Sequence, residues 1–208
     1  MDFISEFFQK LTNIKELVIW AGYTGITLIV FAETGLLIGF FLPGDSLLFT
    51  AGLFASQGMF DIYTLNLLLI PAAIIGDAVG YYIGKKSGEA LYAREESRFF
   101  KKKYLLQTKN FYEKYGNITI VLARFMPFAR TFAPVVAGIA MMKYRNFVIY
   151  NIVGGIGWVL SMTLLGYLLG ANFPIVGKNL ELVIILIVFI SILPGIIKYF
   201  QIRKKENL

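Results

Sequence analysis

A run of residues without a charged side chain extends from residue 147 to residue 171 and is long enough to cross a membrane. A transmembrane helix needs about 20 predominantly apolar residues. Residues 182–200 form a second apolar run of this length, with one basic residue, Lys198, near its end, and residues 65–84 form a third that contains one acidic residue, Asp77. Over the whole chain 57% of residues are hydrophobic and 16% are charged. A soluble core of this size cannot bury that much apolar surface, so much of the chain faces lipid.

We therefore predict one all-helical integral membrane domain covering residues 1–208, with about three full transmembrane helices. Its segments are an amphipathic N-terminal helix (1–16), a first half (17–84), a basic linker (85–116), a second half (117–171) and a final transmembrane helix with a basic tail (172–208). Basic clusters beside apolar segments indicate the cytoplasmic face of a membrane, so the linker and the C-terminus are predicted to be cytoplasmic. Nucleic acid is not an expected partner.

Residues 118–142 are apolar but do not fit a straight membrane-crossing helix. They contain Arg124 and Arg130, and an arginine at the membrane centre costs about 2.5–3.5 kcal/mol on insertion scales. They also contain Pro127 and Pro134, each of which removes a backbone donor and breaks a helix. Irregular backbone at membrane depth is tolerated only beside protein or a water-filled cavity. This pattern predicts a re-entrant helical hairpin.

A weak internal repeat relates the two halves. An offset of 86 positions places Ala51-Gly52 on Ala137-Gly138 and Gly80-Tyr81 on Gly166-Tyr167. Common small residues of membrane helices can produce such matches by chance. If the repeat is real, each half is a hairpin followed by one crossing helix, and the second half is inverted relative to the first, as in many secondary transporters. The sequence leaves open whether residues 17–42 cross fully or form one arm of the first hairpin, and therefore on which side the N-terminus lies.

Ionisable residues inside apolar segments are the candidate functional site. The five are Glu33, Asp45, Asp77, Arg124 and Arg130. Charged groups at membrane depth usually face a cavity and pair with one another, and here the acids come from the first half and the bases from the second. If the hairpins meet, two carboxylates can meet two guanidinium groups. Such a cluster can be a structural ion-pair network, or a site in which arginine binds phosphate and a carboxylate exchanges a proton.

Several neighbouring residues are predicted to support this site. They are Asp77, Gly35, Pro43, Gly44, Pro127, Pro134 and Gly138. Close helix packing explains the glycines at least as well as contact with a ligand. Tyr81 and Trp158 are interpreted as interface anchors or packing residues.

Composition also excludes several kinds of chemistry. The chain has no cysteine and no histidine, which excludes thiol nucleophiles, Cys/His zinc sites and imidazole acid–base catalysis. Its acidic residues are scattered, so neither a bound metal nor a cofactor is expected, and the chain is not expected to be an enzyme.

Three motifs lie in order along the chain. Residues 33–45 read ETGLLIGFFLPGD, residues 76–84 read GDAVGYYIG, and residues 123–138 read ARFMPFARTFAPVVAG. With these motifs the chain resembles the DedA family, also called the SNARE-associated or VTT-domain family, over about residues 30–170. The third motif is similar to the family pattern R-x-x-P-x-x-R-x-x-x-P-x-x-A-G, and Asp45 in the first stands where many members have glutamate.

The resemblance implies two facing re-entrant hairpins in a bacterial inner membrane protein that transports lipid carriers. It implies undecaprenyl phosphate as the most favoured substrate, with proton coupling in some members. By position it makes Arg124 and Arg130 the phosphate-binding residues and Glu33 and Asp45 the proton-coupling residues. The alternatives are a phospholipid flippase or scramblase, for example for phosphatidylethanolamine, and, less favoured, a membrane lipid phosphatase. The sequence fixes neither the lipid nor the coupling ion, and it leaves a homodimer open.

Overall fold

The structure is a computed structural model that describes residues 14–37, 39, 42–93 and 118–173. All regular secondary structure in these ranges is helical, which confirms the predicted all-helical fold. The elements are α2 (Ile14–Gly35), α3 (Gly44–Ser56), α4 (Ile62–Ala93), α6 (Ile118–Arg124), α7 (Pro127–Ile139) and α8 (Tyr144–Asn172). Most of the predicted N-terminal amphipathic helix, most of the basic linker and the predicted final helix lie outside the described residues.

Three described helices are long and apolar enough to cross a membrane: Ile14–Gly35, Ile62–Glu89 and Tyr144–Asn172. The last two correspond to the crossings predicted at residues 65–84 and 147–171. The first covers the region that the sequence left open. It is interrupted at Gly22, whose φ of 54° and ψ of −164° lie outside the helical range. The part of α2 after this break has about the same length as α3, as two arms of a hairpin require.

Helix α4 is longer than predicted, because it continues through Ala93 into the segment interpreted as a linker. Its last turns contain lysine, glutamate and alanine, which are all good helix formers. At its other end, the Thr64 backbone N–H donates to Asp61 Oδ1 at 2.7 Å. This contact caps the helix, and hydrogen bonds of this kind hold the pKa of Asp61 below its ordinary value.

The two prolines of the second hairpin behave differently. The chain breaks between α6 and α7, and Pro127 is the first residue of α7, where a missing N–H costs no hydrogen bond. The prediction of a break at this proline is confirmed. The prediction that Pro134 also breaks the helix is wrong, because α7 continues through it. Helices α2 and α3 form one hairpin, and α6 and α7 form the other. That each hairpin enters and leaves the membrane on the same side stays a prediction.

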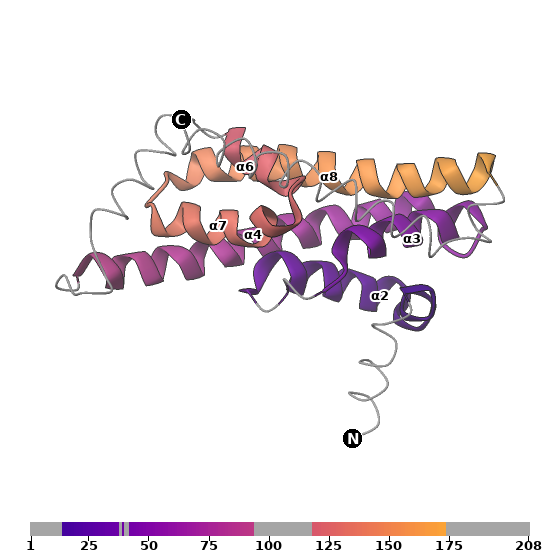
Figure 1. Cartoon of the computed structure of the whole chain (residues 1–208), viewed down its shortest axis with the longest axis horizontal. Coiled ribbons are helices and arrows are strands. Elements are labelled where there is room, and N and C mark those ends of the chain that lie inside the picture. Colours follow the sequence, from indigo (N-terminus) through magenta and orange to yellow (C-terminus); the bar gives the residue numbers. More distant parts are fainter. Residues whose placement is uncertain (1–13, 38, 40–41, 94–117, 174–208) are drawn as a thin grey trace, which may run out of the picture.

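The long helices α4 and α8 run in opposite directions beside each other (Figure 1). Asn66, near the start of α4, accepts a hydrogen bond at 2.8 Å from Thr163, near the end of α8. Asn151, near the start of α8, donates at 2.9 Å to the carbonyl of Ile74, farther along α4. The two halves are therefore inverted relative to each other within the described residues.

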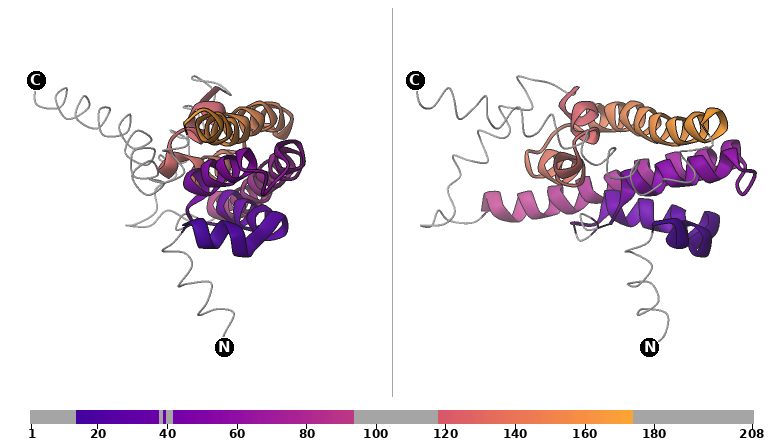
Figure 2. Two further views of the ribbon diagram at one scale, coloured as in Figure 1. Left: turned by 90° about the vertical axis from the view of Figure 1, so that its right-hand side faces the viewer. Right: turned by 45° about the vertical axis from the view of Figure 1, so that its right-hand side comes forward.

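The second arm of each hairpin packs against the crossing helix of the other half. Helix α3 packs against α8, and α7 packs against α4. Both views in Figure 2 show α8 on one side of the bundle and α2 on the opposite side, with α3 and α4 between them. The halves thus exchange their hairpin arms, which the sequence repeat did not indicate.

Glycines allow these exchanged helices to approach closely. The backbone at Gly166 touches the carbonyl of Phe49 in α3, and the backbone at Gly84 touches the carbonyl of Val135 in α7. Phe49 and Val135 differ by the 86 positions of the sequence match, but Gly84 and Gly166 differ by 82. The offset that relates the two crossing helices is therefore about one helical turn shorter than the offset that relates the two hairpin arms. No single offset aligns both parts of the two halves, which explains why the sequence repeat is weak.

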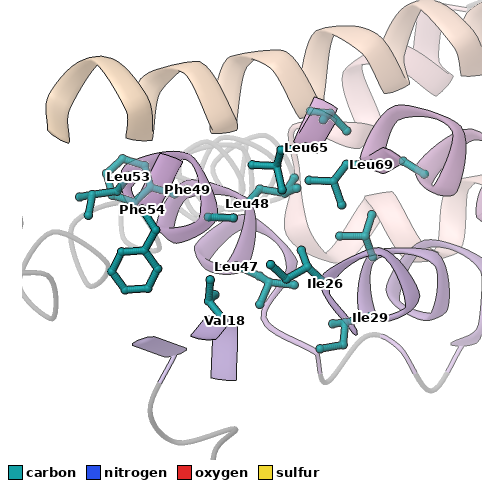
Figure 3. Packing of buried hydrophobic residues seen from close by; sticks show 14 of the residues in the cluster. Val18, Ile26, Ile29, Leu47, Leu48, Phe49, Leu53, Phe54, Leu65 and Leu69 are labelled. Carbon is teal, nitrogen blue, oxygen red and sulfur yellow. The ribbon is translucent and has the colours of Figure 1, made fainter. Parts of the chain in front are cut away.

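The apolar core lies between α2, α3, α4 and α8 (Figure 3). Fully buried members include Leu47, Leu48 and Phe49 of α3. Many large apolar side chains point outward instead, such as Leu67 at 73% exposure and Leu168 at 57%. Because lipid is as apolar as leucine, burial itself drives little helix association in a membrane, and the close glycine contacts and polar pairs have greater weight.

We expect Gly166→Ala to lower the unfolding free energy by about 1–3 kcal/mol, because an overpacked contact forces helices apart. A Cβ at this position would collide with the Phe49 carbonyl and lie 3.0 Å from Leu53 N. The matched control is Gly157→Ala on the same helix, where the nearest atom would be 3.9 Å away on the Phe125 ring. Melting temperatures in detergent compare the two. Equal effects of both substitutions would contradict close packing of α3 on α8.

Candidate functional site

Both hairpin tips meet halfway along the crossing helices. Glu33 lies at the end of α2, Asp45 in the first turn of α3 and Arg130 in the first turns of α7. Asp77 and Trp158 lie near the middle of α4 and α8, respectively. We call the region where these residues gather the hairpin junction. It lies midway along two helices that are long and apolar enough to cross a membrane.

Arg130 is held between two carboxylates that come from the two arms of the first hairpin. Its Nη2 forms an ion pair with Glu33 Oε1, and its Nη1 forms an ion pair with Asp45 Oδ1. The side chains of Arg130 and Glu33 are 4% and 2% exposed, and that of Asp45 is 12% exposed. The second hairpin is thus fastened to both arms of the first through one guanidinium group.

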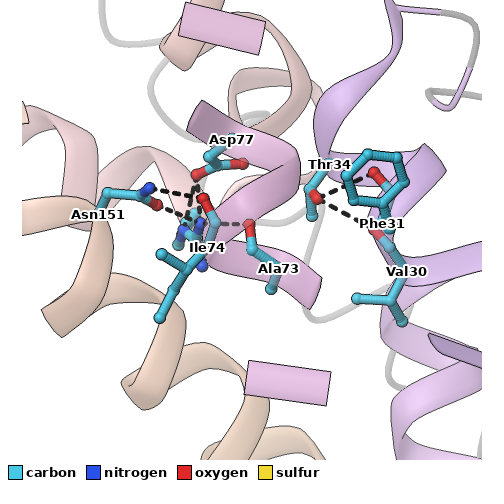
Figure 4. A network of polar contacts seen from close by, with 8 residues as sticks. Val30, Phe31, Thr34, Ala73, Ile74, Asp77 and Asn151 are labelled. Atoms are coloured by element: carbon cyan, nitrogen blue, oxygen red, sulfur yellow. Dashed lines mark hydrogen bonds and ion pairs between the residues drawn. The ribbon is translucent and has the colours of Figure 1, made fainter. Parts of the chain in front are cut away.

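Arg124 forms a second, separate cluster. Its Nη2 pairs with Asp77 Oδ2, and it also donates to Asn151 Oδ1 at 2.6 Å and to the carbonyl of Ala73 at 3.3 Å. Asn151 in turn donates to the carbonyl of Ile74. Figure 4 shows Asp77, Ala73 and Ile74 on one helix facing Asn151 on another. This cluster joins α4, α6 and α8.

The predicted pairing of acids from the first half with bases from the second is present, but its distribution differs from the expectation. Glu33 and Asp45 both form ion pairs with Arg130, whereas Asp77 forms an ion pair with Arg124. Asp77, predicted as a supporting residue, is therefore a full ion-pair partner. The two arginines do not face one common carboxylate pair, because Arg124 precedes the break before Pro127 and points to α4 and α8, whereas Arg130 follows it and points to α2 and α3.

Several buried polar atoms of the two clusters have no hydrogen-bond partner among the described residues. At the junction these are Glu33 Oε2, Arg130 Nε and the Thr131 hydroxyl. In the second cluster they are Asp77 Oδ1 and Arg124 Nη1. Buried polar groups are normally satisfied, and exceptions often mark functional positions. Unused donors and acceptors therefore remain on both arginines and on two of the three acids.

The predicted supporting glycines and prolines lie around these clusters in different roles. A Cβ on Gly44 would meet the Glu33 carboxylate, so this glycine makes room for the acid. Gly35 packs on the Gly76 backbone, and Gly138 packs on the carbonyl of Tyr81, as helix contacts. Pro43 directly precedes α3 and Pro127 begins α7, so both helices start at the junction.

Sequence reasoning missed three contributors. Trp158 donates its indole N–H to Asp45 Oδ1 at 2.7 Å, although its position suggested an anchor or packing residue. Asn151 binds Arg124, and a Cβ on Gly155 would lie 2.6 Å from Arg124 Nη1. A buried asparagine in a run without charges is a signal that could have been used, because polar side chains at membrane depth usually have partners. The tryptophan and the glycine carry no such signal.

One end of the bundle is basic and aromatic. Lys85, Lys86 and Glu89 with Tyr82 line a shallow pocket of about 410 Å³ at the end of α4. Tyr82 contacts Tyr144 at the start of α8, with ring centroids 5.2 Å apart. Tyrosines are enriched at membrane–water interfaces, and lysines near helix ends reach toward headgroups. This end therefore has the character of an interfacial zone.

Comparison with known proteins identifies relatives along nearly the whole chain. The model of the VTT domain matches residues 42–168. The chain is 45% identical over 207 residues to Protein DedA of Escherichia coli K12, covering 98% of this chain and 94% of that protein. It is 50% identical over 169 residues to an uncharacterized membrane protein of Mycobacterium leprae, covering 81% of this chain and 75% of the relative.

A more distant relative is the inner membrane protein YqjA of Escherichia coli K12, which is 34% identical over 148 residues and covers 71% of this chain and 67% of its own length. No solved structure matches the chain significantly. The family resemblance indicated by the three motifs is confirmed by the match to the VTT domain. The chain is a membrane protein that belongs to the DedA family of VTT-domain proteins.

Proposed function

We propose that this member of a transporter-like membrane protein family is a flippase for a phosphate-bearing lipid carrier, undecaprenyl phosphate, and that protons drive it. The observation that carries the proposal is the buried guanidinium group of Arg130, shared by Glu33 and Asp45 where the two hairpin tips meet. A charged group is costly at membrane depth and is characteristic of substrate and ion pathways. Arginine also matches the geometry of phosphate better than lysine does.

The environment of Arg130 favours an anion. Helices α3 and α7 both begin at the hairpin junction. The N-terminus of a helix carries partial positive charge and free backbone N–H groups, which bind phosphate in many proteins. Arg130 Nε has no partner among the described residues and remains available as a donor.

The charges at the junction explain why protons would be coupled to the lipid. One guanidinium and two carboxylates sum to a formal charge of −1 when all three are ionised. A phosphate that approaches Arg130 adds further negative charge in a region of low dielectric, which is unfavourable. Protonation of a displaced carboxylate removes this excess. Uptake of the phosphate and uptake of a proton therefore favour each other.

The two carboxylates are suited to different parts of this exchange. Asp45 Oδ1 receives two donors, Arg130 and the Trp158 indole, which hold it in place. Glu33 has only Arg130 as a donor among the described residues, and its Oε2 is buried without a partner. We assign proton uptake and release to Glu33 and the role of fixed counter-ion to Asp45. Asp77 is a further acid on the side of α4 that faces the end of α2, because its neighbour Gly76 packs on Gly35.

The inverted halves support alternate opening to the two sides. In secondary transporters, inverted repeats place the substrate site at their interface near the membrane midplane, and one repeat rocks against the other. The hairpin junction occupies the corresponding position. Following the positive-inside rule, we place the basic end around Lys85, Lys86 and Lys143 in the cytoplasm. The name of the relative YqjA supports an inner membrane location.

We assign Arg124 a fastening role, which differs from the phosphate-binding role that the resemblance implied. Its donors go to Asp77, to the Asn151 amide and to a backbone carbonyl. It thereby holds α6 against the two crossing helices. Among the described residues, the Arg130 side chain is held instead by Glu33 and Asp45 of the opposite hairpin and by Trp158.

The proposal predicts that purified protein in proteoliposomes transports undecaprenyl phosphate and that a pH gradient stimulates this transport. Transport is measured as the fraction of radiolabelled lipid that becomes accessible to phosphatase added outside. Glu33→Gln is expected to remove the stimulation by the gradient, because the amide takes up no proton. The matched control is Asp61→Asn, which changes an acid outside the membrane and keeps the helix cap.

Transport of undecaprenyl phosphate at the level of protein-free liposomes would contradict the proposed substrate. In that case the same vesicles, loaded with labelled phosphatidylethanolamine, test the phospholipid alternative. Gradient stimulation that is unchanged in Glu33→Gln would instead contradict the assignment of the proton to Glu33 and leave the substrate in place.

A further inference from the structure

Trp158 contacts both kinds of charge at the hairpin junction. Its side chain is fully buried in the middle of α8. The indole N–H donates to Asp45 Oδ1 at 2.7 Å, and the guanidinium carbon of Arg130 lies 4.3 Å from the ring centroid, over its face. The edge of the ring thus binds the anion while its face binds the cation. A tryptophan that only filled space would need neither contact.

The contact with the Trp158 ring does not use the N–H donors of Arg130. A guanidinium group binds an aromatic ring through its flat face, whereas its N–H donors point outward in the plane of the group. Contact with Trp158 therefore does not compete with a phosphate that binds the N–H edge. Both arginines use N–H donors in their ion pairs, Arg124 with Asp77 and Arg130 with Glu33 and Asp45, and Arg130 has the ring contact in addition.

We propose that Trp158 is a positioning residue for phosphate binding, which keeps the Arg130 guanidinium beside Asp45 at the junction when Glu33 releases it. This proposal rests on the proposed function. During exchange, phosphate replaces at least one carboxylate, and the arginine passes through states in which its present ion pairs are incomplete. The ring face remains as a favourable surface for the cation in these states, because cation–π attraction is strongest where water is excluded. The indole N–H meanwhile keeps Asp45 beside the arginine.

Two substitutions separate the ring from its N–H group. Trp158→Phe keeps a weaker aromatic face and loses the donor to Asp45, whereas Trp158→Leu loses both. We expect Trp158→Leu to raise the KM for undecaprenyl phosphate about tenfold with little change in the maximal rate, and Trp158→Phe to raise it less. A purely structural role would lower the yield and maximal rate without this change in KM. Unchanged KM values in both variants would overturn the proposal.

Tryptophan fluorescence provides a second readout that does not depend on transport. The chain has two tryptophans, Trp20 and Trp158, so Trp20→Phe leaves Trp158 as the sole indole. Undecaprenyl phosphate added to this variant in detergent is expected to change the Trp158 emission in a saturable manner. Undecaprenol, which lacks the phosphate, is the control lipid and is expected to cause no change. Adding Arg130→Gln to the same background is expected to abolish the response.

Binding of radiolabelled undecaprenyl phosphate, measured in parallel, distinguishes failure of this proposal from failure of the proposed function. Binding of the lipid without any change in Trp158 emission would overturn the role of Trp158 alone. No binding of the lipid to the unsubstituted protein would overturn the proposed function and, with it, this proposal. A response that undecaprenol reproduces would also overturn it, because the phosphate would then have no effect at Arg130.

Discussion

Replacing Arg130 with glutamine is expected to reduce transport of undecaprenyl phosphate on the order of a hundredfold. Removing one partner of a buried charge-assisted contact costs about 2–5 kcal/mol, and about 1.4 kcal/mol corresponds to a factor of ten. Glutamine offers phosphate neither a positive charge nor a two-pronged donor. The measurement is the initial rate of transport in proteoliposomes at matched protein content.

Two further variants show whether such a loss is chemical or structural. Arg130→Lys keeps the charge but replaces the planar fork with a point donor, so it is expected to fold and to transport about tenfold more slowly. The triple variant Glu33→Gln, Asp45→Asn, Arg130→Gln leaves no uncompensated charge at the junction and is expected to fold without transporting. Transport at the normal rate by Arg130→Gln would contradict the proposed phosphate site.

Removing Arg124 is expected to have the largest effect on stability. Arg124→Leu leaves the carboxylate of Asp77, 1% exposed, without its ion-pair partner. Breaking a buried pair in this manner costs about 3–5 kcal/mol, whereas replacing both partners with apolar residues is often close to neutral. The double variant Asp77→Leu, Arg124→Leu is therefore expected to recover most of the lost stability. Melting temperatures in detergent, read by size-exclusion chromatography after heating, compare the single and double variants.

The same pair of variants tests the fastening role assigned to Arg124. Because this cluster is proposed to hold α6 rather than the substrate, the double variant is expected to retain measurable transport. If the double variant folds as well as the original chain but transports nothing, Arg124 binds the lipid directly. If the single variant is as stable as the original chain, the buried pair does not hold the helices together.

Sequence patterns predicted those features that depend on one segment at a time. The apolar runs located α4 and α8, and Pro127 marked the break between α6 and α7. The five charged residues of the two clusters were found because each lies in an otherwise apolar segment. Contacts between segments were harder to predict. That Arg124 meets Asp77, and Arg130 meets Glu33 and Asp45, depends on which way the chain turns at Pro127, which no local pattern encodes.

Two errors have local physical causes. Pro134 was predicted to break a helix, but a proline removes only one hydrogen bond, and neighbouring packing can compensate at membrane depth. Trp158 was interpreted as an anchor or packing residue because an aromatic residue near the middle of an apolar run has many ordinary roles. Only its position opposite Asp45 and Arg130 reveals its second role.

The exchange of hairpin arms has a consequence for how the chain is made. A ribosome delivers α3 into the membrane long before α8, the helix against which α3 packs. During this interval the small residues of α3 and the carboxylate of Asp45 have no α8 and no Arg130 to contact. The first half therefore reaches its final form only after the second half has been inserted. We therefore expect the nascent first half to need shielding from other partners until α7 and α8 have been synthesised.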